Sequence, residues 1–191
     1  MKSALLLCAI ALLAVLSMNP LPAQAGPINL ATLTCQKYQN EVIASPTNQE
    51  KLDPINTMMW LFGFSVAKTG AHVMYGDALT GFGFALDAEC KSNPNESLQD
   101  ALGVVKHSEK HPMDLTTLDC GTFKLRDSDM RKNDAESADT IMMWLYGFAV
   151  QKSGGHILDA DQLGQFKNKF SADCGKQPGR SLFDTLSAMK P

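Results

Sequence analysis

The stretch MMWLFGFSVAKTGAH, residues 58–72, occurs a second time as MMWLYGFAVQKSGGH, residues 142–156. Read as a helix, each copy carries apolar side chains around nearly its whole circumference. A helix of this kind is normally buried on nearly all sides. The rest of the chain therefore has to cover two such helices.

The repetition extends well beyond these helices. At a constant offset of 84, residues 58–98 and 142–182 are identical at 18 of 41 positions, and Cys35 corresponds to Cys120 at an offset of 85. Self-similarity over such a length indicates a duplicated structural unit. We expect a first unit at 26–105, a charged linker containing Pro112 at 106–114, and a second unit at 115–191.

The first 25 residues have the features of a secretory signal peptide. Lys2 precedes the apolar run ALLLCAIALLAVL, and the small-residue sequence AQA at 23–25 suits cleavage before Gly26. No later stretch approaches the ~18 apolar residues of a membrane-spanning helix. We therefore expect an exported chain without a membrane span.

Four cysteines follow the predicted signal peptide, namely Cys35, Cys90, Cys120 and Cys174. An even number of cysteines in an exported chain indicates disulfides, and four cysteines allow three connectivities. The repeat favours Cys35–Cys90 and Cys120–Cys174, one bridge in each unit. A Cys90–Cys120 bridge across the linker stays open as an alternative that would break the equivalence of the units.

Apolar spacing and helix-terminating residues predict an all-α fold of two four-helix units. The second helix has Asp53 as its expected N-cap, Pro54 at its first position and Gly70 just after its end. The expected helices are 35–43, 54–69, 77–90 and 96–105 in the first unit, and 117–126, 137–153, 161–174 and 180–189 in the second.

The two apolar helices have two apolar stripes each, and a unit of this size can cover only one. We expect the second stripes to pack against each other as an internal pseudo-dimer, with Gly63 and Gly147 allowing a close approach. The alternative is one compact eight-helix domain in which these helices are simply the core.

The motifs LTCQKY, an aromatic-rich helix ending in KTG, and DALTGFGFALDAECKSNPNESLQDA resemble the HdeA/HdeB family of periplasmic acid-stress chaperones. The resemblance covers 33–105, and 118–189 keeps the Cys, Trp, Lys-x-Gly and Cys-x-x-x-Pro positions. Typical members have one unit per chain and form homodimers, whereas this chain carries two units and could act as a monomer.

The resemblance implies a periplasmic, ATP-independent holdase that is folded and inactive at neutral pH. Acid would loosen it and expose apolar surface to unfolded or acid-denatured periplasmic proteins. Methionine-rich apolar surfaces suit such promiscuous binding. The expected client-binding and interface residues are Met58, Met59, Trp60, Phe62, Phe64, Val66, Met142, Met143, Trp144, Tyr146, Phe148 and Val150.

Acid would change the charge of the chain drastically. Without the signal peptide there are 16 basic and 20 acidic side chains, so the net charge of −4 becomes about +20 when the carboxylates are neutral and four histidines are charged. The acid-sensing candidates are His72, Asp77, Asp87, Glu89, His156, Asp159, Asp161 and Asp173. Asp77 and Asp161 also stand where N-caps are expected, and the two histidines stand near helix C-termini, where their charge would stabilise the helix.

No nucleophile–base arrangement, metal-ligand spacing or basic patch stands out, so we expect no enzyme, no cofactor, no metal site and no nucleic-acid partner. The alternative function is a constitutive periplasmic protein-binding module, such as an immunity-type inhibitor of a secreted toxin, without acid activation.

Overall fold

The computed structural model describes residues 27–43, 54–75, 79–105 and 112–190. The first unit contains β1 (Ile28–Asn29), α2 (Cys35–Lys37), the π-helical turn η1 (Tyr38–Ile43), α3 (Pro54–Lys68), β2 (Val73–Tyr75), α4 (Leu79–Ser92) and α5 (Leu98–Val104). The second contains β3 (Pro112–Asp114), α6 (Cys120–Asn133), α7 (Ala135–Lys152), β4 (Ile157–Leu158), α8 (Ala160–Lys176) and α9 (Leu182–Ser187). The expected pair of four-helix units is confirmed.

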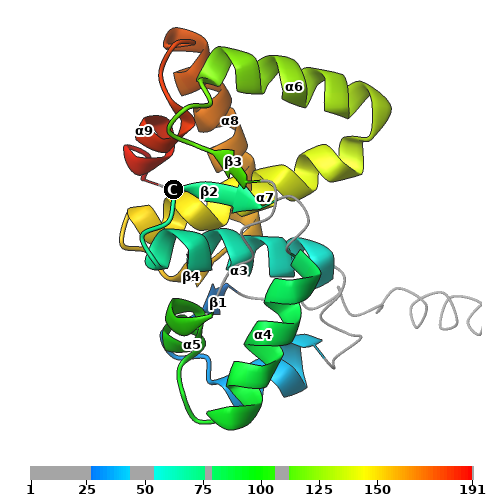
Figure 1. Ribbon diagram of the computed structural model, residues 1–191, viewed down its shortest axis with the longest axis vertical. Coiled ribbons are helices and arrows are strands. Elements are labelled where there is room, and N and C mark those ends of the chain that lie inside the picture. The colour runs from blue at the N-terminus through cyan, green and yellow to red at the C-terminus, as the bar shows by residue number, and fades with distance from the viewer. Residues whose placement is uncertain (1–26, 44–53, 76–78, 106–111, 191) are drawn as a thin grey trace, which may run out of the picture.

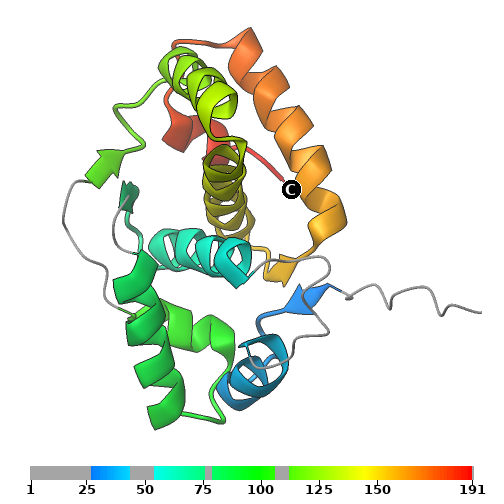
Figure 2. The same ribbon diagram turned by 90° about the vertical axis from the view of Figure 1, so that its right-hand side faces the viewer.

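The two apolar helices, α3 and α7, lie side by side at the centre of the molecule (Figure 1). Helices α4 and α5 lie on one side of this pair, and α6, α8 and α9 lie on the other (Figure 2). Nearly all the buried apolar side chains belong to one continuous core cluster that includes both units. The pseudo-dimer and the compact-core interpretations therefore describe the same arrangement.

Both disulfides join the residues that the repeat favoured. Cys35–Cys90 connects α2 to α4, and Cys120–Cys174 connects α6 to α8. Each bridge fastens the first helix of a unit to its third helix. The alternative Cys90–Cys120 pairing is therefore wrong.

Helix ends follow the local sequence at most positions. Gly70 and Gly154 end α3 and α7 with φ of 78° and 79°, a conformation in which only glycine is unstrained. Helix α6 continues to Asn133, past its expected end near residue 126. Pairs of opposite charge, such as Asp127 with Arg131 four residues later, support this extra length. The expected N-cap Asp53 lies outside the described residues.

Four short strands were not predicted, and they connect the units reciprocally. Strand β1 pairs with β4 of the second unit, and β2 pairs with β3, which forms the end of the expected 106–114 linker. The backbone N–H of Leu30 donates to the carbonyl of His156, and that of Leu115 donates to the carbonyl of His72. Each unit thus supplies its leading segment to the other.

Candidate client-binding faces and acid-sensitive contacts

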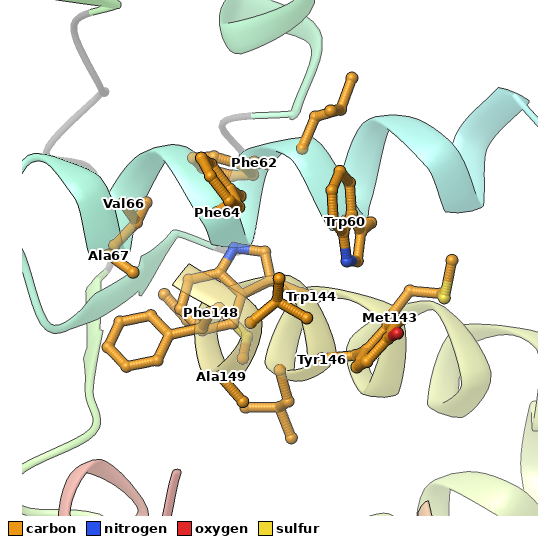
Figure 3. Packing of buried hydrophobic residues seen from close by; sticks show 14 of the residues in the cluster. Trp60, Phe62, Phe64, Val66, Ala67, Met143, Trp144, Tyr146, Phe148 and Ala149 are labelled. Atoms are coloured by element: carbon orange, nitrogen blue, oxygen red, sulfur yellow. The ribbon is translucent and has the colours of Figure 1, made fainter. Parts of the chain in front are cut away.

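Ten of the twelve expected face residues are buried in the neutral fold. Met58 and Met59 are the two exceptions, and both are partly exposed. Trp60 and Trp144 are completely buried, and both indoles lie in the space between α3 and α7 (Figure 3). The aromatic faces that were expected to bind clients are therefore covered by protein.

The aromatic side chains of each apolar helix are covered partly by their own unit and partly by the other unit. Phe62 contacts Trp144 of the other unit edge-on, with ring centroids 6.4 Å apart, and also stacks on Phe82 of its own α4 at 4.8 Å. Its counterpart Tyr146 packs on Phe166 of its own α8 at 5.2 Å. Each apolar helix thus presents one face to its own unit and another to the opposite helix.

Gly63 and Gly147 lie where the two helices cross. A Cβ atom added to Gly63 would overlap the carbonyl oxygen of Trp144 and lie 3.1 Å from the backbone nitrogen of Phe148. A Cβ atom added to Gly147 would overlap the carbonyl oxygen of Trp60 in the same way. The expected close approach at these glycines is confirmed, and the crossing is symmetric.

The same contact buries two unsatisfied donors. The indole N–H groups of Trp60 and Trp144 have no hydrogen-bond acceptor among the described residues. A buried donor without a partner costs about 1–3 kcal/mol. The α3–α7 contact therefore combines extensive apolar burial with a polar cost that is relieved when the helices separate.

The predicted acid sensors do not gather at one place. Nε2 of His72 lies 3.9 Å from the carboxylate of Asp114, and its ring lies 6.0 Å from that of Phe183. Asp87 pairs with Lys91 at 2.6 Å, and Glu89 accepts from the side chain of Asn93 at 2.7 Å.

Three of the remaining candidates lie near the ends of α8. Asp159 is the N-cap of α8, a role that was considered for Asp161, which lies in the first turn of that helix. Asp173 pairs with Lys169 at 2.9 Å. The hydrogen bond from Lys169 is the main reason why the pKa of Asp173 is lowered. His156 is half-buried, and Asp77 lies outside the described residues.

In the part of the chain that the structure describes, sequence reasoning missed five other carboxylates whose pKa is lowered. Hydrogen bonds are the largest cause at four of them: from Ser97 to Asp100, from Thr116 to Asp114, from Thr122 to Asp119 and from Ser137 to Asp134. At the fifth, Asp139, burial raises the pKa, but bonds from Lys167 and Arg131 outweigh it. Asp119 and Asp134 are N-caps of α6 and α7, so a search for caps would have found them.

These groups are distributed unevenly between the repeats. Among the described residues, five of the six carboxyl groups with lowered pKa lie at or after residue 114. At the positions of Asp114, Asp119 and Asp139 the first unit has Asn29, Thr34 and Ile55. Thr34 caps α2 with a hydroxyl that does not titrate in acid. Over the described ranges, acid therefore removes more stabilising interactions from the second unit than from the first.

Within the described parts of the chain, no cluster of three or more His, Cys, Asp or Glu side chains could hold a metal ion. The helices found there are too short or too polar to cross a bilayer. A family model described as the HdeA/HdeB family matches residues 4–100 and again 103–184. No curated protein and no solved structure matches the chain.

Proposed function

This chain belongs to the HdeA/HdeB family, with two copies of the family unit, and on that basis we propose that it is an ATP-independent acid-stress chaperone of the periplasm. Its role would be to hold acid-denatured proteins and prevent their aggregation, without catalysing a reaction. The family is periplasmic, and two disulfides fit an oxidising compartment. The predicted signal peptide at 1–25 agrees with export.

The observation that carries the proposal is the mutual burial of the α3 and α7 aromatic faces. A binding surface that is covered at neutral pH must be uncovered to act, and here each face is part of the other's cover. Separating α3 from α7 would release both faces at once. The two buried indole N–H groups would then regain hydrogen bonds with water.

Acid supplies the driving force for this separation. A carboxyl group whose pKa is lower in the folded state stabilises the fold above its unfolded pKa, about 4, and that contribution is lost as the pH falls through the folded value. Six carboxyl groups of the described residues act in this direction, and the growing positive charge adds repulsion. We therefore expect activation below about pH 4.

The direct test is suppression of client aggregation from pH 7 to pH 2. The proposal predicts little protection at pH 7, where the faces of α3 and α7 are covered, and strong protection below about pH 4, near the ordinary carboxyl pKa. Absence of protection at every pH would overturn it. A tight, saturable complex with one folded partner at pH 7 would instead favour the constitutive binding module.

A further inference from the structure

Each repeat has a hollow at the same position, between the first and third helices of the unit, and the two hollows differ. The hollow of the first unit has a volume of about 530 Å³ and is lined by residues of α2/η1, α3 and α4. That of the second has about 240 Å³ and is lined by the corresponding residues of α6, α7 and α8. Volumes of about 300–1,000 Å³ are usual for ligand pockets.

Substitutions between the repeats explain the difference. Phe84, 73% exposed, and Gly83 line the first hollow, where the second unit has Asn168 and Lys167. Met58 and Leu86 add further apolar surface to the first hollow. A Cβ atom added to Gly83 would lie 3.8 Å from Cε of Met58, so a longer side chain at this position would stand against Met58. We call this hollow the Phe84 groove.

The second hollow is crossed by charged side chains. Nζ of Lys167 lies 2.7 Å from a carboxylate oxygen of Asp139, and Arg131 pairs with the same oxygen at 3.0 Å and with Asp127 at 2.9 Å. The first unit has Ile55 at the position of Asp139, so this network has no counterpart there. The Phe84 groove has one ion pair in its lining, Asp87 with Lys91, so it keeps a larger and more apolar hollow than the second unit, where linked ion pairs cross the space.

We propose that the Phe84 groove binds apolar segments of unfolded polypeptides while the two repeats are still packed together. This inference rests on the proposed chaperone function and gives it a first binding site. The exposed faces of α3 and α7 would add to this site after acid opening. The two repeats would then have different roles. The first unit would bind clients, and the second unit would respond to acid.

The charges that line the two hollows favour binding of an unfolded polypeptide in the Phe84 groove. In acid, unfolded proteins carry a large positive charge because their carboxylates are neutral. With its own carboxylates neutral, the second hollow presents three cations, Lys124, Arg131 and Lys167, to such a chain. Among the described residues, the Phe84 groove presents one, Lys91. Repulsion therefore excludes a cationic client from the second hollow far more than from the first.

The wall of the groove also holds a free hydrogen-bonding group. Tyr38 is 97% buried, since its exposed fraction is 3%, and its hydroxyl has no partner among the described residues. Its counterpart in the second hollow is Phe123, which has no polar atom on its ring. A peptide carbonyl would reach this hydroxyl only if the Tyr38 side chain turned toward the groove, because the hydroxyl oxygen is buried. Mostly apolar walls with few polar groups are typical of ligand pockets.

The test is anisotropy titration at pH 7 of a fluorescein-labelled 14-residue apolar peptide that carries two lysines, with tryptophan emission recorded to show that the repeats stay packed. The unmodified protein should bind the peptide. Phe84→Asn and Gly83→Lys, which introduce the residues of the second repeat, should weaken binding at least fivefold. Helix propensity favours Lys over Gly, so the second variant should fold well.

The matched control is Leu125→Ser, which removes an equally exposed apolar side chain, 72% accessible, from α6. It should leave peptide binding unchanged. Equal loss in all three variants, or no loss in Phe84→Asn and Gly83→Lys, would overturn the groove assignment.

Aggregation suppression by the unmodified protein in acid separates the two proposals. If it is strong while Phe84→Asn binds peptide normally, the groove assignment is wrong and the chaperone function stands. If it is absent, the chaperone function fails, and the assignment of clients to the groove fails with it.

Discussion

Two glycines allow α3 and α7 to pack as closely as they do. In most helices glycine costs about 0.5–1 kcal/mol relative to alanine, because it leaves the unfolded chain more freedom. At Gly63 and Gly147 the missing methyl group is what permits backbone contact across the repeat. The ordinary rule for glycine in a helix should therefore reverse at these two positions.

Gly63→Ala should lower the free energy of unfolding by about 2 kcal/mol, since the methyl group forces the helices apart. Urea denaturation at pH 7 measures this change. The matched control is Gly164→Ala in α8, where an added Cβ meets nothing within 4 Å. The control should be neutral or stabilising by up to about 1 kcal/mol. A stabilised Gly63→Ala protein would refute the close contact.

At the level of single elements, α7 and α8 are linked by a carboxylate that acid neutralises. Asp139 of α7 accepts from Lys167 of α8 and from Arg131 of α6, so one side chain joins three helices. The bridge is half-exposed, which limits its contribution to about 1 kcal/mol or less. The contribution of this bridge to stability depends on pH.

Asp139→Asn should reduce the stability of the protein by up to about 1 kcal/mol at pH 6–7. Because the pKa of Asp139 is lowered in the fold, the difference from the unmodified protein should shrink below about pH 4 and vanish near pH 2. Urea midpoints at several pH values test this. The control is Asp129→Asn, whose pair with Lys132 is highly exposed, and its midpoints should match those of the unmodified protein throughout.

The elements differ in how far the sequence predicts them. The helices and disulfides could be predicted because the repeat contains two copies of the sequence pattern for each of them. Strands of two or three residues, such as β1 and β4, are too short to show alternation, and they form only where the other unit supplies a partner. The acid-sensitive carboxylates were mostly missed because caps and cross-helix pairs depend on where each helix begins and what lies beside it.

At the scale of the whole molecule, the two repeats are joined by exchanged strands as well as by the central helices. Strand β1 belongs to the first unit by sequence and to the second by pairing, and β3 has the reverse relation. A homodimer would obtain these contacts only by association. Here one chain holds both partners, so we expect its assembly not to depend on the concentration of the protein.

The midpoint of the acid transition should therefore be the same at 0.5 and 50 µM protein when followed by circular dichroism. For an intermolecular dimer, dilution would shift the transition toward higher pH, because dissociation is favoured at low concentration. A shift of that kind would mean that opening separates two chains rather than two repeats. Sedimentation at pH 7 would then show a dimer.

The central claim, that acid uncovers the faces of α3 and α7, can be measured with the protein's own fluorophores. Trp60 and Trp144 are the only tryptophans in the chain, and both are completely buried at this contact. Tryptophan emission and acrylamide quenching, recorded from pH 7 to pH 2 beside aggregation suppression, report the opening directly. The account predicts a red shift and increased quenching over the same pH range in which protection appears. Full protection while both tryptophans remain buried and unquenched would contradict it.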